Sequence, residues 1–197
     1  MSAIANPVTQ TPPWKLPSRG KVGMACLIIA ESAIFTIFVV AYLFYVGKSL
    51  TGPTPREVLE TPIFYSICLL SSSLTIHFAA KSLARDRVGA FLGLWALTIV
   101  LGGTFMYGTA QEWHRLIYEH GLTISTNLFG TTYYSLVGLH AFHVTAGLLM
   151  LLIVAIFALV GRVGVRQSRR VEVLSMYWHF VDVVWVVVFT VVYVLGR

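Results

Sequence analysis

The chain has 197 residues, of which 57% are hydrophobic and only 11% are charged, and its mean hydropathy is +0.79. This composition lies far from that of soluble domains and favours a protein that folds in a lipid bilayer. The net charge is +6, but the basic residues stand in short segments between apolar runs, where they act as orientation signals, so no nucleic-acid partner is expected.

Five apolar runs are long enough to cross a bilayer, since a spanning helix needs about 20 mainly apolar residues. Residues 1–20 precede them as a proline-rich polar arm with nothing to make a core. The first run is too long for a signal peptide and lacks an Ala-x-Ala cleavage site, so we expect it to be retained. The sequence therefore predicts an all-α fold, with a five-helix transmembrane domain over residues 21–197. The expected spans are 21–46, 62–80, 88–110, 131–160 and 173–196.

Lysine and arginine are distributed unevenly between the two sides of this predicted bundle. Ten of the 14 lie in the segments on the side of the N-terminus, against four on the other side. Because basic residues are retained on the cytoplasmic side of a membrane, we expect a cytoplasmic N-terminus and an outside C-terminus.

Small residues inside the runs carry two further predictions. Cys26 and Cys68 are expected to be small buried residues, and their different depths at about 1.5 Å of rise per residue argue against a disulfide. Gly102, Gly103 and Gly147 are expected to allow close contacts between helices.

Seven titratable residues fall within or at the end of the predicted spans, where ionisable groups are costly and usually face the bundle interior. Counted along the helices, four of them lie at one depth near the inner surface and are predicted to form a polar layer if their helices are neighbours: Glu31, His77, His179 and Asp182. The other three are His140 and His143 in the fourth span and Glu112 at the outer end of the third.

The last span contains the most informative stretch, MYWHFVDVVW. Helical spacing places six residues of the last span on one stripe that is predicted to face protein: Ser175, His179, Asp182, Val186, Phe189 and Tyr193. The neighbouring flank, which has no polar group to hide, is Trp178, Val181, Trp185 and Val188. We expect His179 and Asp182 to hydrogen-bond one another or partners across the bundle, and burial would favour the protonated form of Asp182.

Four interpretations of these polar residues remain open on spacing alone. His140 or His143 with His179 would offer axial ligands to haem, and Glu31 or Asp182 would carry protons or ions in a transporter. A metal site would draw on His140, His143, Glu112 and Glu31. The fourth interpretation is that these groups form hydrogen bonds that fix helix register within a larger complex.

Three motifs resemble subunit III of haem-copper terminal oxidases over about residues 20 to 196. The last transmembrane segment of that family is similar to YWHFVDVVW followed by FTVVY, and its penultimate helix is similar to GLHAFHVTAGLLML. The helix of the family that bears a single glutamate resembles IIAESAIFTIFVVAYLFY, with Glu31. KSLARDR and Gln111-Glu112-Trp113 fall where the family has similar elements.

The resemblance implies a non-catalytic subunit of a respiratory complex that reduces oxygen to water and pumps protons. It implies direct packing against subunit I, with subunit II, a small subunit IV and a respiratory supercomplex as further partners. Haem and copper are then expected in partner subunits and no cofactor in this chain, with phospholipid as the ligand to consider. The seven titratable residues become candidate structural, lipid-binding or proton-uptake residues, and the expected location is the bacterial cytoplasmic membrane.

Two points separate this chain from other members of the family. Long forms carry two further N-terminal helices that enclose a lipid-filled cleft, whereas this chain resembles the short five-helix form. The sequence of the last helix resembles that of the cytochrome c oxidases most, with quinol oxidases second and the accessory subunit of nitric oxide reductases third. A small transporter and a haem-binding membrane anchor are the alternatives of another class.

Overall fold

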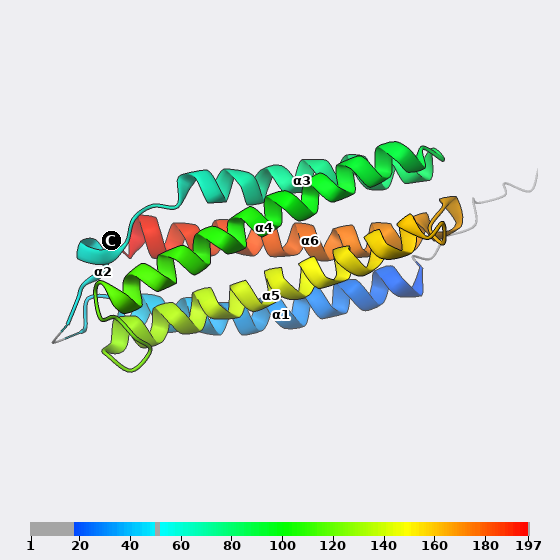
Figure 1. Ribbon diagram of the computed structural model, residues 1–197. Helices are drawn as coiled ribbons and strands as arrows, with labels where there is room; N and C mark the ends of the chain where they lie inside the picture. Colours follow the sequence, from blue (N-terminus) through cyan, green and yellow to red (C-terminus); the bar gives the residue numbers. More distant parts are fainter. Residues whose placement is uncertain (1–17, 50–51, 197) are drawn as a thin grey trace, which may run out of the picture.

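The computed structural model describes residues 18–49 and 52–196, and long helices dominate this part of the chain (Figure 1). Five of them are long and apolar enough to cross a bilayer, which confirms the predicted all-α bundle. They are α1 (Arg19–Tyr45), α3 (Ile63–Ala84), α4 (Val88–Tyr118), α5 (Leu128–Leu159) and α6 (Ser168–Phe189), which the π-helical η2 (Thr190–Leu195) continues. The connections hold the short elements α2 (Pro55–Val58) and η1 (Val165–Gln167).

Local sequence signals explain where several helices begin and turn. The Ser18 hydroxyl accepts a hydrogen bond from the backbone N–H of Lys21 at the start of α1, and the Asn127 side chain caps α5 in the same way. The turn between α3 and α4 contains Asp86 at φ 61°, and the turn after α5 contains Gly161 at φ 72°. Glycine adopts such angles without steric cost, and aspartate tolerates them better than most residues.

The helices extend past the predicted spans at several ends. α4 continues to Tyr118 rather than ending near residue 110, and α6 begins at Ser168 rather than near residue 173. The 31 residues of α4 correspond to about 46 Å of helix, whereas the hydrocarbon core of a bilayer is about 30 Å thick. Hydropathy marks only the apolar part of a helix, so the polar ends were missed. Arg19 and Gly20, which we expected in the arm, already belong to α1, and residues 1–17 lie outside the described residues.

α6 occupies the centre of the bundle (Figure 1). It lies between the hairpin of α3 and α4 on one side and the pair of α1 and α5 on the other, and it packs against α1, α3 and α5. One end of the bundle, where α1, α4 and α6 begin and α3 and α5 end, carries most of the lysines and arginines, and we call it the basic end.

The most buried face of α6 is the tryptophan flank, not the stripe that we expected. Trp178 and Val188 are completely buried, Trp185 is nearly so, and Val186 from the predicted stripe is 47% exposed. The prediction that this stripe faces protein holds for Ser175, Asp182 and Tyr193, which are buried, but not for Val186. It overlooked the flank because it looked for polar groups to hide, whereas each indole has an N–H to satisfy. The Trp178 indole donates to the hydroxyl of Ser72 at 2.8 Å. The Trp185 indole likewise donates to a serine hydroxyl of α3.

Two glycines make the slot that holds the Trp178 indole. A Cβ atom added to Gly102 on α4 would lie 2.9 Å from the Trp178 ring, and one added to Gly147 on α5 would lie 2.8 Å from it. A Cβ on Gly103 would meet nothing within 4 Å. The predicted close contact therefore holds for Gly102 and Gly147 but not for Gly103.

α1 is the least covered of the five helices. Within the described residues, its extensive contacts with other long helices are to α5 and α6. Large apolar side chains such as Ile29 and Ile37 are 71% and 67% exposed. Cys26 is exposed on this helix, so its predicted burial was wrong, while Cys68 on α3 is buried. Both cysteines are free, as we expected.

Candidate functional site

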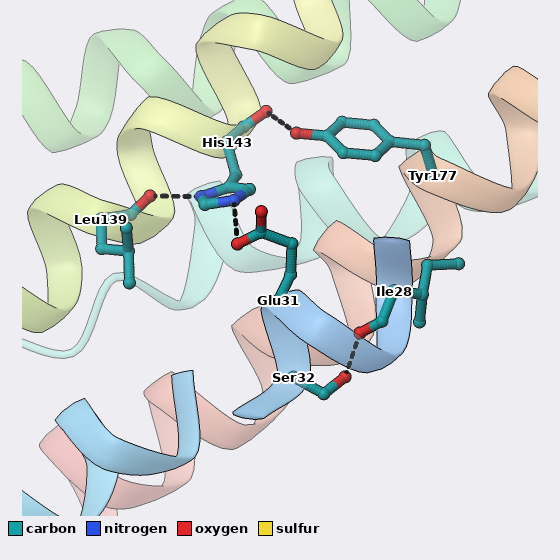
Figure 2. Close-up of polar contacts among 6 residues, drawn as sticks. All are labelled: Ile28, Glu31, Ser32, Leu139, His143 and Tyr177. Atoms are coloured by element: carbon teal, nitrogen blue, oxygen red, sulfur yellow. Dashed lines mark hydrogen bonds and ion pairs between the residues drawn. The ribbon is translucent and has the colours of Figure 1, made fainter. Parts of the chain in front are cut away.

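Glu31 on α1 and His143 on α5 point toward one another between their helices (Figure 2). Glu31 Oε2 lies 3.2 Å from His143 Nε2, and His143 Nδ1 lies 2.8 Å from the carbonyl oxygen of Leu139. A carbonyl oxygen can only accept, so Nδ1 carries a hydrogen. The hydrogen shared by Nε2 and Oε2 then belongs either to an imidazolium beside a carboxylate or to a carboxylic acid beside a neutral ring. The pair has no net charge in either form, which suits a membrane interior.

This pair connects three helices. The Tyr177 hydroxyl on α6 donates to the backbone carbonyl of His143 at 3.2 Å, as Figure 2 shows. The Phe35 ring on α1 lies 5.0 Å from the imidazole, centroid to centroid. The side chains of His143 and Glu31 are 8% and 23% exposed, so both are largely shielded. These contacts therefore join α1 to α5 and α5 to α6.

A second polar group joins α3 to α6. The hydroxyl of Ser73 lies 3.0 Å from His179 Nδ1 and is hydrogen-bonded to Asp182 Oδ2. Asp182 is 3% exposed, and its other carboxylate oxygen has no hydrogen-bond partner among the described residues. His179 and Asp182 thus meet a partner across the bundle, and that partner is one and the same hydroxyl.

A pocket of about 470 Å³ lies next to His179 at the basic end. Its polar lining includes His77 and Lys81 from α3 and Glu172 from α6. The Glu172 carboxylate also accepts from Lys21 on α1 at 2.6 Å. The pocket therefore places exposed polar side chains of α3 and α6 next to the second polar group, and Lys21 of α1 pairs with one of them.

Glu112 belongs to a third group near the other end of the bundle. Both of its carboxylate oxygens lie 2.9 Å from the hydroxyl of Tyr193 on η2, which donates its one hydrogen to the carboxylate group. One turn further along α4, Arg115 forms an ion pair with Glu60 in the connection before α3. Glu112 lies inside α4 rather than at its end, because the helix continues for six residues beyond it, to Tyr118.

His140 lies inside an aromatic cluster. Its imidazole stacks on Trp185 at a centroid distance of 5.0 Å and meets Phe105 edge-on at 5.8 Å. The residue is 1% exposed, and neither ring nitrogen has a hydrogen-bond partner among the described residues. A haem at this position would have to displace the rings that surround the imidazole, so the arrangement does not fit the haem interpretation.

The single polar layer that we predicted is divided between the two sides of α6. Glu31 pairs with His143, whereas His179 and Asp182 contact α3, with His77 nearby in the same pocket. Counting along a helix gives the height of a residue but not its direction, and α6 separates α1 from α3 (Figure 1). In addition, α1 begins at Arg19, two residues before the predicted span, so Glu31 is 12 residues (31 − 19), or about 18 Å, from the start of its helix.

A groove with a volume of about 610 Å³ runs along the boundary between α1 and α6. Its lining is mostly apolar and includes Val183 and Val187 from α6. The hydroxyls of Ser32 and Thr36 on α1 also line it, each bonded to a carbonyl oxygen of the preceding turn. This face of the chain therefore offers a long apolar surface with few free polar groups.

Comparison with known proteins bears on the chain as a whole. The family described as cytochrome c oxidase subunit III matches residues 17–197. The chain belongs to this family. Its relatives include the cytochrome c oxidase subunit 3 of Synechocystis sp., which is 39% identical over 184 residues, 91% of this chain and 77% of the relative.

Other relatives in this subunit III family come from both oxidase types. The cytochrome c oxidase subunit 3 of Alkalihalophilus pseudofirmus is 32% identical over 168 residues, 84% of this chain and 82% of the relative. The cytochrome bo(3) ubiquinol oxidase subunit 3 of Pseudomonas aeruginosa is 31% identical over 176 residues, 88% of this chain and 84% of the relative. The predicted resemblance to subunit III of haem-copper oxidases is confirmed.

Membership identifies the chain as a subunit III of a haem-copper oxidase, a multi-pass membrane protein within an oxidoreductase complex. Subunit III is not the catalytic subunit of such complexes, and the family lacks redox centres. Within residues 18–49 and 52–196, no three side chains of His, Cys, Asp or Glu gather in a way that would hold a metal ion. Glu31 and His143 satisfy each other, and Glu112 is bonded elsewhere, so the metal set that we considered is not brought together.

Sequence reasoning missed the uncharged partners. Ser73, Tyr177 and Tyr193 each bond one of the polar groups across a helix boundary. A usable signal was present for Ser73, because it lies one turn before His77 on α3 and so shares a face with a titratable residue.

Proposed function

We propose that this chain is the non-catalytic supporting subunit of a respiratory oxidase that reduces oxygen to water and pumps protons. Subunit I of that complex carries haem and copper and packs directly against this chain, and subunit II, a small subunit IV and a respiratory supercomplex complete the set of partners. The chain stabilises subunit I during turnover and supports its proton uptake. Its location is a bacterial cytoplasmic membrane.

One observation carries this proposal: the interior polar groups are mostly bonded to one another across helix boundaries. Glu31 bonds His143 between α1 and α5, Asp182 bonds Ser73 between α6 and α3, and Tyr193 bonds the carboxylate of α4. Hydrogen bonds of this kind fix helix register in a membrane, where apolar surfaces alone do not discriminate between registers. Such a bundle is suited to present a constant surface to a neighbouring subunit.

The test compares oxidase complexes that contain Glu31→Gln and Asp182→Asn with the wild-type complex. We expect less stable assembly, weaker proton pumping, or faster loss of oxygen reduction over successive turnovers, because each change replaces an ionisable group in a link between helices. Unchanged assembly, pumping and resistance to turnover inactivation in both variants would reject the supporting role. Ser71→Ala, on α3 but outside these links, serves as the control.

Cytochrome c is the proposed electron donor and quinol the second candidate. The relative with 39% identity is a cytochrome c oxidase subunit, whereas the two quinol oxidase subunits from Pseudomonas are 31% and 32% identical. The donor binds outside this chain, so the deciding observation is the accompanying subunit II. A dinuclear copper motif there would support cytochrome c, and its absence would support quinol.

We propose that the basic end faces the cytoplasm, which puts the N-terminus inside and the C-terminus outside. The support is the excess of ten basic residues over four, together with helices that alternate in direction. Single cysteines at Arg85 and at Glu119, in a variant without Cys26 and Cys68, would test this with a membrane-impermeant thiol reagent on intact cells. Labelling at residue 119 alone is expected, and labelling at residue 85 alone would reverse the orientation.

Phospholipid is the proposed ligand of the groove between α1 and α6. The groove volume of about 610 Å³ and its apolar lining suit acyl chains. Val183→Trp would fill the groove, whereas Val186→Trp changes an exposed position of the same helix outside its lining. We expect the first variant to reduce the phospholipid that co-purifies with the complex and the second to leave it unchanged.

A further inference from the structure

The Ser73 hydroxyl contacts two titratable side chains at once, and this constrains where hydrogens lie. It is 3.0 Å from His179 Nδ1 and bonded to Asp182 Oδ2. A serine hydroxyl has one hydrogen, so it cannot donate to both partners. The two hydrogen bonds must therefore run in one direction, either from His179 through Ser73 to Asp182 or from Asp182 through Ser73 to His179.

The two directions differ in the protonation of Asp182. In the first, the ring donates from Nδ1, the serine donates to Oδ2, and Asp182 is a carboxylate. In the second, a protonated Asp182 donates to the serine, which donates to Nδ1 of a neutral ring. A proton that arrives at Nε2 of His179 converts the first arrangement into the second: the Nδ1 hydrogen moves to Ser73 Oγ, and the serine hydrogen moves to Asp182 Oδ2. The ring ends neutral with its hydrogen on Nε2, so one added proton is now held by Asp182.

Burial favours the protonated arrangement. Asp182 is 3% exposed, and Oδ1 has no hydrogen-bond partner among the described residues. A carboxylate with one unpartnered oxygen in a membrane interior is costly, and protonation removes the charge. The imidazolium form of His179 beside a carboxylate holds the same number of protons, but it leaves the charge on Oδ1 unpaired.

His179 also lines the pocket at the basic end, from which a proton can reach it. This pocket of about 470 Å³ includes His77, Lys81 and Glu172 in its lining. Glu172 is half-exposed and paired with Lys21, so the pocket rim is accessible to water. His179 is therefore positioned between a polar pocket and a buried carboxyl group.

Other titratable groups near α6 are engaged elsewhere. On α1 and α5, Glu31 pairs with His143, and His140 stacks on Trp185. Between Arg87 and Tyr107, α4 carries no titratable side chain. Hence His77, Lys81 and Glu172 are the titratable side chains of the pocket that lie nearest to the hydrogen bonds from His179 to Asp182.

We propose that Asp182 is a proton-binding site that exchanges its proton with the pocket at the basic end through Ser73 and His179. The inference rests on the proposed supporting role for its purpose in the oxidase, but its chemistry is a property of this chain alone. His179 is the entry, Ser73 the bridge and Asp182 the group that stores the proton.

Infrared spectroscopy of the intact oxidase complex tests this proposal. At neutral pH we expect the carbonyl stretch of a buried carboxylic acid, which shifts in heavy water and disappears in Asp182→Asn. Ser73→Ala and His179→Phe should slow the deuterium exchange of this band at least about tenfold, because each removes a link of the relay. Ser73→Thr keeps a hydroxyl and should restore fast exchange, and Ser71→Ala should exchange as the wild type does.

Two results would overturn the proposal. One is a band that is absent at neutral pH or that persists in Asp182→Asn, since Asp182 would then not hold the proton. The other is wild-type exchange in both Ser73→Ala and His179→Phe, since the proton would then reach Asp182 by another route. The expected band in the wild type and the expected exchange rates in the variants would support the relay, whatever the activity of Asp182→Asn. Unchanged turnover and pumping in Asp182→Asn would then count only against the supporting role.

Discussion

Replacing Gly102 by alanine should destabilise the bundle because the new methyl group enters the slot of Trp178. A Cβ at this position would lie 2.9 Å from two atoms of the indole and 3.0 Å from Leu148 Cδ2. The indole cannot move aside easily, because it is completely buried, its N–H is bonded to Ser72 at 2.8 Å, and Gly147 closes the other side. Overpacking of this kind costs about 1–3 kcal/mol.

The adjacent glycine provides the matched control. Gly103→Ala adds the same methyl group to the same helix where nothing lies within 4 Å, so both variants share the gain of about 0.5–1 kcal/mol in helix propensity. The difference between Gly102→Ala and Gly103→Ala therefore isolates the clash, and we expect about 1–3 kcal/mol in the free energy of unfolding. The assay is unfolding in mixed detergent, followed by tryptophan fluorescence. Equal stability of the two variants would show that Trp178 is not held in this slot.

Three further predictions concern polar contacts. Glu31→Leu should lower the free energy of unfolding by about 1–3 kcal/mol and Glu31→Gln by less, because only leucine leaves its histidine partner without a hydrogen bond; equal losses would contradict this. A double-mutant cycle of Ser66→Ala and Trp185→Phe should give a coupling of about 0.6 kcal/mol, at most about 1.7, and additive losses would argue against their 3.0 Å hydrogen bond. The pKa of Glu57 lies below its ordinary value because the backbone N–H of Thr54 donates to its carboxylate. The hydrogen bond therefore stabilises the start of α2 fully above the ordinary pKa, and this stabilisation is lost as the pH falls through the lowered pKa. The Thr54 amide resonance in NMR should follow the titration of Glu57, and this pH dependence should disappear in Glu57→Gln.

The number and order of the spanning helices could be predicted from sequence because both follow from the length of apolar runs. The ends could not, since polar residues continue the helices after the hydropathy signal stops, as in α4 through Tyr118. The depth of a residue along its helix could also be estimated from sequence, but the direction of each side chain depends on how α6 packs among its neighbours. The partner of Glu31 is therefore His143 and not the residues predicted at its depth.

Aromatic packing lay furthest from the sequence pattern. Trp178 and Trp185 looked like an apolar flank, yet their N–H groups bond two serines of α3, and the second ring stacks on His140. Spacing cannot reveal such contacts, because they require that the indole and its acceptor meet from two helices that are far apart in sequence. The family resemblance was carried by the same stretch, which identified the class of protein without giving the reason for its residues.

Purification of the membrane complex with a mild detergent tests the central claim most directly. We expect this chain to co-purify with a larger subunit that binds haem and copper, and we expect the band of this chain itself to contain no haem. A haem that stays with the isolated chain, or a chain that never co-purifies with a haem-rich subunit, would contradict the account.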